Sequence, residues 1–208
     1  SNRFKKANRI KRAAYPGEQR AKIKVKRRRE CGMFTFHHGF WLYFFSRRHP
    51  QVWQFVAGSM LPDYVYVALL AVLILKRDIA PGDIFHFSPA AFMTYIPQYP
   101  WAIHIDLAGH SAVFWGAAFL FTLLPGFARI QAFVVGWGTH LLLDGVTHAA
   151  HANFFLYPLS LAAVHSPVSY WEPAFFAREF KLVNGTLMGL TAAYLIYHWW
   201  KKRQERNR

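Results

Sequence analysis

The chain has 208 residues, of which 54% are hydrophobic, and carries a formal net charge of +15. An apolar chain with so much positive charge must hold the two properties in different segments, which excludes a simple soluble acidic enzyme, a collagen-like repeat and a fully disordered chain. A single cysteine, Cys31, excludes an internal disulfide and a zinc site built from four thiolates.

The first segment, residues 1–30, is basic and has no apolar stretch of the kind found in a signal peptide. A second basic run, KKRQERNR, occupies residues 201–208. We predict that both are cytoplasmic tails that flank a helical membrane domain at residues 31–200. For residues 1–30, a solvated tail, binding to anionic membrane lipids and contact with a larger membrane protein complex all remain open. Nucleic acid is disfavoured as a partner, because no recognisable binding module is present.

Four apolar segments are each close to the 20 residues that a helix needs to cross a bilayer, namely residues 52–75, 107–124, 130–146 and 184–200. Residues 34–45 form an apolar stretch too short to span comfortably, which indicates an interfacial or re-entrant helix. The predicted fold class is therefore all-α, a polytopic transmembrane helical bundle of about four spans plus this short helix. A fifth short span and a compact soluble helical protein are the alternatives.

Four spans place both termini on the same side of the membrane. That side would hold 21 of the 25 lysines and arginines. Because positive loops stay on the cytoplasmic side, we predict that both termini are cytoplasmic. The expected location is the inner membrane of a prokaryote.

Ionisable residues inside the predicted spans are the main functional signal, because an unpaired charge at membrane depth is costly. His140, Asp144 and His148 lie at i, i+4 and i+8 in GWGTHLLLDGVTH and share one helix face. A histidine followed one turn later by a carboxylate is good spacing for two ligands of one divalent metal ion. Asp63 follows Pro62, which predicts a break in the first span and room for a site there.

Four imidazoles and two carboxylates from four separate apolar segments can meet in the outer half of the bundle, namely those of His38, Asp63, His110, His140, Asp144 and His148. His38 reaches the others only if its helix re-enters the membrane. We predict a divalent metal ion, with zinc as first choice, and assign His148 and Asp144 as catalytic candidates, either as general base or as orienting group. A hydrogen-bonded His–Asp network without metal, and a haem or chlorophyll-type pigment, are the alternatives.

Five motifs occur in order between about residues 36 and 171: HHGF, HPQVWQFVAGSMLPD, AGHS, HLLLDGVTH and FLYPLS. This series resembles the bacterial and archaeal membrane-bound metal-dependent hydrolases and, more distantly, the zinc-dependent phospholipase C and nuclease group. The resemblance implies the metal ligands His38, Asp63, His110, His140 and Asp144, with His148 beside the site.

The function expected from these observations is hydrolysis by a metal-activated water that attacks an ester or phosphoester near the lipid headgroups. The alternative is a non-catalytic accessory or structural subunit of a larger membrane protein complex, in which the His/Asp site is structural or vestigial. The state of the His/Asp cluster discriminates the two, because a catalytic metal keeps an open coordination position.

Overall fold

A computed structural model describes residues 35–82, 92, 94–149 and 154–207. The predicted tail at residues 1–30 therefore lies outside the described residues. All regular secondary-structure elements assigned in the described residues are helical, as the all-α prediction requires. The α-helices are α2 (Thr35–Ser46), α3 (Val52–Met60), α4 (Tyr64–Leu75), α6 (Pro100–Gly109), α7 (Ala112–Thr122), α8 (Gln131–Thr147) and α9 (Ala177–Arg206). Short 3-10 turns lie at η1 (Leu61–Asp63), η3 (Ile96–Gln98), η4 (Ala128–Ile130) and η5 (Pro173–Phe175).

The first predicted span is present as Val52–Leu75, which is 24 residues long and apolar enough to cross a membrane. It is not one regular helix, because the 3-10 turn η1 joins α3 to α4. Pro62 lies in this turn and lacks a backbone N–H, so it cannot continue the α-helical hydrogen-bond pattern. The predicted break is therefore confirmed, and it places Asp63 at the point of interruption.

The second predicted span differs from the expectation of one helix over residues 107–124. Helix α6 ends at Gly109, α7 begins at Ala112, and the two are bent by 59°. The Ser111 side chain caps α7 by accepting hydrogen bonds from the backbone N–H groups of Val113 and Phe114. This bent pair is a broken span or a re-entrant loop, and His110 lies at its corner.

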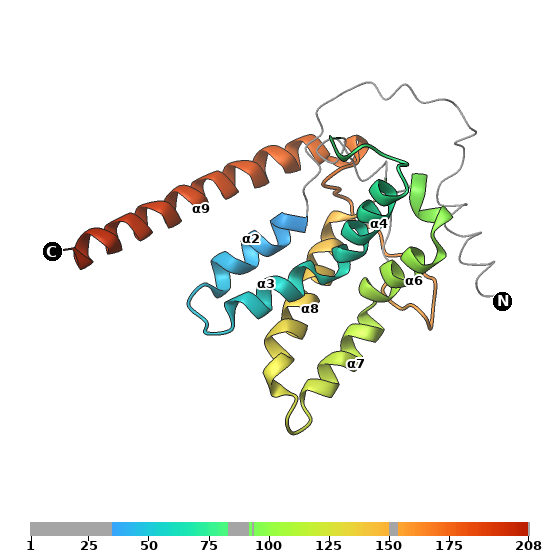
Figure 1. Cartoon of the computed structure of the whole chain (residues 1–208), viewed down its shortest axis with the longest axis horizontal. Coiled ribbons are helices and arrows are strands. Elements are labelled where there is room, and N and C mark those ends of the chain that lie inside the picture. Colours follow the sequence, from blue (N-terminus) through green and yellow to red (C-terminus); the bar gives the residue numbers. More distant parts are fainter. Residues whose placement is uncertain (1–34, 83–91, 93, 150–153, 208) are drawn as a thin grey trace.

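The remaining predicted spans correspond to α8 and to the middle of α9. By length and composition, the described residues contain one helix that can cross a membrane, or two if the bent α6–α7 pair counts as one span. The four-span count thus stays a prediction. Helix α9 has 30 residues and includes the basic residues from Lys201 to Arg206, so the C-terminal charge continues a helix. In Figure 1, α9 extends well beyond the other helices.

Helices α3 and α8 cross in close contact (Figure 1). A Cβ atom on Gly58 would collide with the carbonyl oxygen of Phe133, and one on Gly136 would collide with the carbonyl oxygen of Phe55. Small residues let two membrane helices approach backbone to backbone in this way. Since His140 lies one turn after Gly136, the crossing brings it against the end of α3.

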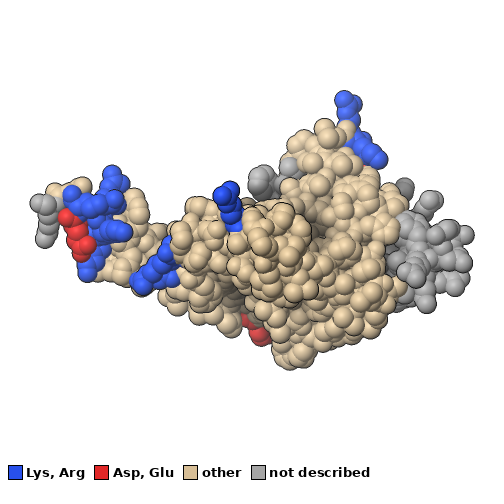
Figure 2. Space-filling view, turned by 90° about the horizontal axis from the view of Figure 1, so that it is seen from below, with Lys and Arg blue, Asp and Glu red and all other residues tan. Residues whose placement is uncertain are grey.

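The surface and the loops agree with a membrane setting. Figure 2 shows a broad face without charge, with a group of Lys and Arg at the far end of α9. Large apolar side chains are exposed on several helices, including Leu75 on α4 and Leu142 on α8. The Gln51 amide donates a hydrogen bond to the carbonyl oxygen of Arg129 at 3.4 Å. The α2–α3 and α7–α8 turns are therefore neighbours.

Candidate metal centre

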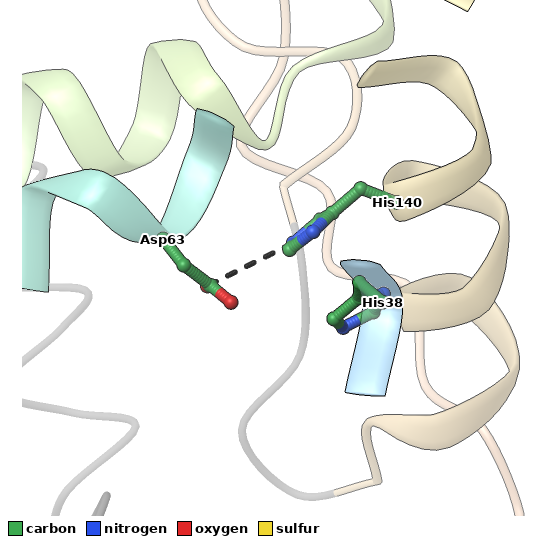
Figure 3. A group of neighbouring side chains, drawn as sticks. All are labelled: His38, Asp63 and His140. Carbon is green, nitrogen blue, oxygen red and sulfur yellow. Dashed lines mark ion pairs between the residues drawn. The ribbon is translucent and has the colours of Figure 1, made fainter. Parts of the chain in front are cut away.

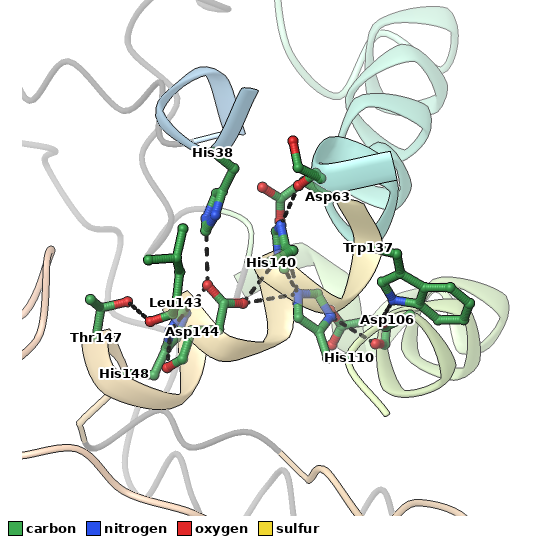
Figure 4. A network of polar contacts seen from close by, with 12 residues as sticks. His38, Asp63, Asp106, His110, Trp137, His140, Leu143, Asp144, Thr147 and His148 are labelled. Atoms are coloured by element: carbon green, nitrogen blue, oxygen red, sulfur yellow. Dashed lines mark hydrogen bonds and ion pairs between the residues drawn. The ribbon is translucent and has the colours of Figure 1, made fainter. Parts of the chain in front are cut away.

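The candidate ligands meet where the helices are interrupted (Figure 4). Asp63 lies in η1, His110 at the corner between α6 and α7, and His140 and Asp144 on α8. Interrupted backbone at membrane depth is tolerated where it is buried in protein or lines a cavity, and here it surrounds this cluster. Residues His140 and Asp144 are 0% and 2% exposed.

His110, His140 and Asp144 form a triangle of ligand atoms. The Nε2 atoms of His110 and His140 are 3.3 Å apart. Asp144 Oδ2 lies 3.1 Å from His140 Nε2 and 3.4 Å from His110 Nε2. Ligands bound tetrahedrally to zinc at about 2.0–2.1 Å are separated by roughly 3.3–3.4 Å, so the triangle has the size of one face of such a tetrahedron.

Asp63 lies beside the two histidines of this triangle. Its Oδ1 atom is 3.9 Å from His110 Nε2 and 3.8 Å from His140 Nε2, slightly wider than the other separations. Its side chain is also more exposed than that of Asp144. Asp63 is therefore the carboxylate with more room to move.

The tautomers of the two central histidines follow from their partners. His140 Nδ1 lies 2.7 Å from the carbonyl oxygen of Ser59, and His110 Nδ1 lies 2.9 Å from that of Asp106. A carbonyl oxygen only accepts, so both Nδ1 atoms carry the proton. In the neutral rings both Nε2 atoms then present lone pairs to each other and to Asp144. A cation between these lone pairs relieves the repulsion that they would otherwise exert, and this orientation by the second nitrogen is typical of metal-bound histidine.

Asp106 contacts the Nδ1 side of His110, opposite the Nε2 atom of the triangle. Its Oδ1 atom lies 3.3 Å from His110 Nδ1 and accepts a hydrogen bond from the hydroxyl of Tyr66 at 2.7 Å. Neither Asp106 nor Tyr66 is among the metal ligands and catalytic candidates predicted from the sequence. Helical spacing is the signal that could have identified both, because Asp106 lies four residues before His110 and Tyr66 lies three residues after Asp63.

His148 lies behind Asp144 rather than at the triangle. Its Nδ1 atom is 3.6 Å from Asp144 Oδ1 and 3.1 Å from the Asp144 carbonyl oxygen, and its Nε2 atom is 3.4 Å from the Tyr170 hydroxyl. Burial raises the pKa of the Tyr170 phenol well above its usual value, and the Asp144 carboxylate adds to this. Tyr170 therefore stays protonated and can donate to His148. Of the two catalytic roles predicted for His148, the geometry favours the orienting one.

His38 does reach the cluster, which settles the question left open by its position on the short helix α2. Figure 3 shows its ring beside that of His140, with Asp63 facing both. The two rings stack with centroids 4.0 Å apart. His38 Nε2 lies 3.5 Å from Asp144 Oδ1. His104 lies on an exposed part of α6, beside the hydroxyl of Tyr157.

Two groups of three side chains in the described residues could each hold a metal ion, namely His110, His140 and Asp144, and His38, Asp63 and His140. The structure thus brings all five predicted ligands together from four parts of the chain. A scan against protein-family models finds no match for the chain. Searches of curated proteins and of solved structures also find no significant match. The metal-ligand role of these residues therefore depends on their geometry and not on a relative.

Proposed function

We propose that this chain is an integral membrane hydrolase that uses a divalent metal ion, with zinc as first choice, to cleave an ester or phosphoester near the lipid headgroups. The observation that carries the proposal is the triangle of His110 Nε2, His140 Nε2 and Asp144 Oδ2, with separations of 3.1 to 3.4 Å. Both imidazoles have their other nitrogen bound to a carbonyl oxygen, so their lone pairs are already aimed at one point. Such a site is organised before the ion binds.

The charges also fit a divalent cation. The carboxylates of Asp63 and Asp144 face the two histidines and oppose the charge of a divalent ion, which lowers the cost of burying it. When bound, such an ion lowers the pKa of a water molecule and polarises the bond to be cleaved.

Residues of the chain supply the remaining roles. Ser59 and Asp106 hold the tautomers of the two histidines, and His148 with Tyr170 holds Asp144 in place. We assign Asp63, the more exposed carboxylate, to take up the proton released from the attacking water.

The setting of the centre supports a substrate in the lipid headgroup region. The ligands lie at breaks in apolar helices, and the outer surfaces of these helices expose large apolar side chains. The topology that we propose has both termini in the cytoplasm, with the turns at Arg48 and Arg129 on that side. Anionic lipids or a membrane protein complex are the proposed partners of residues 1–30.

A structural metal site in an accessory subunit of a larger membrane complex is the second candidate function. The burial of His140 and Asp144 favours it, because structural metal sites are closed whereas catalytic sites keep an open position. Both candidate functions require the bound metal ion, but only the hydrolase turns over a substrate.

The test is the metal content and hydrolytic activity of the full chain purified in detergent. We expect bound metal in the wild type and in a His104→Ala control, and its loss in His140→Ala and Asp144→Asn. If the wild type and His104→Ala turn over a phosphoester or lipid ester and the other two variants do not, the hydrolase is supported. Bound metal without turnover supports the structural site, and absence of metal from the wild type overturns both.

A further inference from the structure

We propose that the centre takes a second divalent metal ion, held by His38 and bridged to the first ion through Asp144. This inference rests on the metal centre proposed above and concerns the same pocket. The first ion occupies the His110 site, made by His110, His140 and Asp144 Oδ2. The second occupies the His38 site, made by His38, Asp144 Oδ1 and Asp63.

The two oxygen atoms of Asp144 face different histidines (Figure 4). Oδ2 lies within 3.4 Å of the Nε2 atoms of both His110 and His140. Oδ1 lies 3.5 Å from His38 Nε2 and 3.6 Å from His148 Nδ1. A carboxylate that presents one oxygen to each of two sets of imidazoles is arranged to bridge two ions, and such pairs are spaced by about 3.5–4 Å.

The ring of His38 is poorly placed to share the ion of the His110 site. Two imidazoles bound tetrahedrally to one ion at about 2.0–2.1 Å have ring centres roughly 5 Å apart. The rings of His110 and His140 meet this condition, with centroids 5.2 Å apart and planes inclined by 61°. The rings of His38 and His140 are stacked, with centroids 4.0 Å apart and planes inclined by only 26°. His38 is therefore directed at a separate point.

His38 is also incompletely satisfied. It is 8% exposed, and its Nδ1 atom is buried without a hydrogen-bond partner among the described residues. Burying an unpaired polar atom is unfavourable, so packing alone does not explain why the His38 ring is buried there. Asp63 and His140 each offer an atom within 4.8 Å of a ligand atom of His38. The other nitrogen, Nε2, lies 3.5 Å from Asp144 Oδ1, and this is the side of the ring on which a second ion would bind.

The charge of two ions implies an anionic ligand. Even with Asp106, which lies beside His110, the carboxylates of Asp63 and Asp144 bring three negative charges against the four positive charges of two divalent ions. Because an uncompensated buried charge is costly, we expect the second ion to bind together with an anion such as a phosphate group. This narrows the proposed substrate to a phosphoester, whose oxygen atoms two metal ions can clamp.

The test counts metal ions per chain by elemental analysis of the full-length protein in detergent, dialysed against zinc with inorganic phosphate. We expect two ions per chain in the wild type and in His104→Ala, one in His38→Ala and in His38→Gln, and none in Asp144→Asn. Retained helical circular dichroism and thermal transitions show which variants are folded. Manganese loading adds a spectroscopic readout, because two bridged Mn²⁺ ions couple magnetically and a single ion does not.

The failures of the two proposals are distinguishable. No bound metal in the wild type overturns the metal centre itself. One ion per chain, with or without phosphate, leaves the metal centre standing and overturns the second site. Loss of all metal from both folded His38 variants also overturns it, because His38 would then belong to a single shared site.

Discussion

The Nε2 atoms of His110 and His140 face each other at 3.3 Å although the two residues are 30 positions apart. Each ring is fixed by a backbone carbonyl on its far side, from Asp106 and Ser59. The helices thus hold these two nitrogen atoms close together in a buried place, next to the Asp144 carboxylate. This arrangement is maintained by the way the helices pack where they are interrupted. It does not depend on the histidine side chains themselves.

Chelation should destabilise the protein. A ligand that binds only the folded state at 100 times its dissociation constant stabilises that state by about 2.7 kcal/mol. We therefore expect EDTA to lower the melting temperature of the wild type and of His104→Ala. His140→Ala should melt at one temperature with or without EDTA. Equal melting of the wild type in both conditions would contradict a metal that supports the fold.

Asp106 should control metal affinity without being a ligand. Removal of a group that orients a ligating histidine typically weakens metal binding by about 10–100-fold. We expect Asp106→Ala to weaken metal binding by this factor. Tyr66→Phe should weaken it less, because Tyr66 acts on His110 only through Asp106. Competition with a fluorescent zinc chelator measures both affinities. An Asp106→Ala protein with unchanged affinity would show that His110 needs no support.

Gly136 should be required for the centre although it touches no ligand. A leucine there would collide with the backbone of Phe55 and force α3 away from α8. We expect Gly136→Leu to destabilise the fold by about 3 kcal/mol, the upper end of the usual range for overpacking, and to lose metal.

Gly116→Leu is the matched control for this change, because Gly116 lies on α7 with open space where a Cβ atom would be. Metal content and thermal unfolding of the two variants give the comparison. If Gly136→Leu retained the metal while folded, the close crossing of α3 and α8 would not be what assembles the site.

The two ends of the first span should be accessible from opposite sides of the membrane. In a Cys31→Ser background, we expect Arg48→Cys to react with an impermeant maleimide only from the cytoplasmic side. Lys76→Cys, at the other end of α4, should react only from the opposite side. Labelling of intact cells and of inverted vesicles measures this. Reaction of both cysteines from one side would exclude Val52–Leu75 as a span.

The parts of the site that sequence could predict are those set by local spacing. His140 and Asp144 are one helical turn apart, so any helix over this segment places them side by side, and the structure has α8 there. Pro62 interrupts the first span because it has no N–H to donate, and this too is a local property. The bend in the second predicted span was not foreseen, because Ser111 caps a new helix at a point that the apolar pattern of residues 107–124 does not reveal.

Composition and spacing within single helices were enough to predict the helices of the described residues, an apolar segment at Val52–Leu75 long enough to span a membrane, and a set of histidines and aspartates in apolar surroundings. They could not predict that His38 stacks on His140, that Asp106 lies against the far side of His110, or that the two oxygens of Asp144 face different rings. Such relationships depend on how closely α3 and α8 approach at their glycines and on the bend between α6 and α7, and contacts between distant segments leave no periodic trace in the chain.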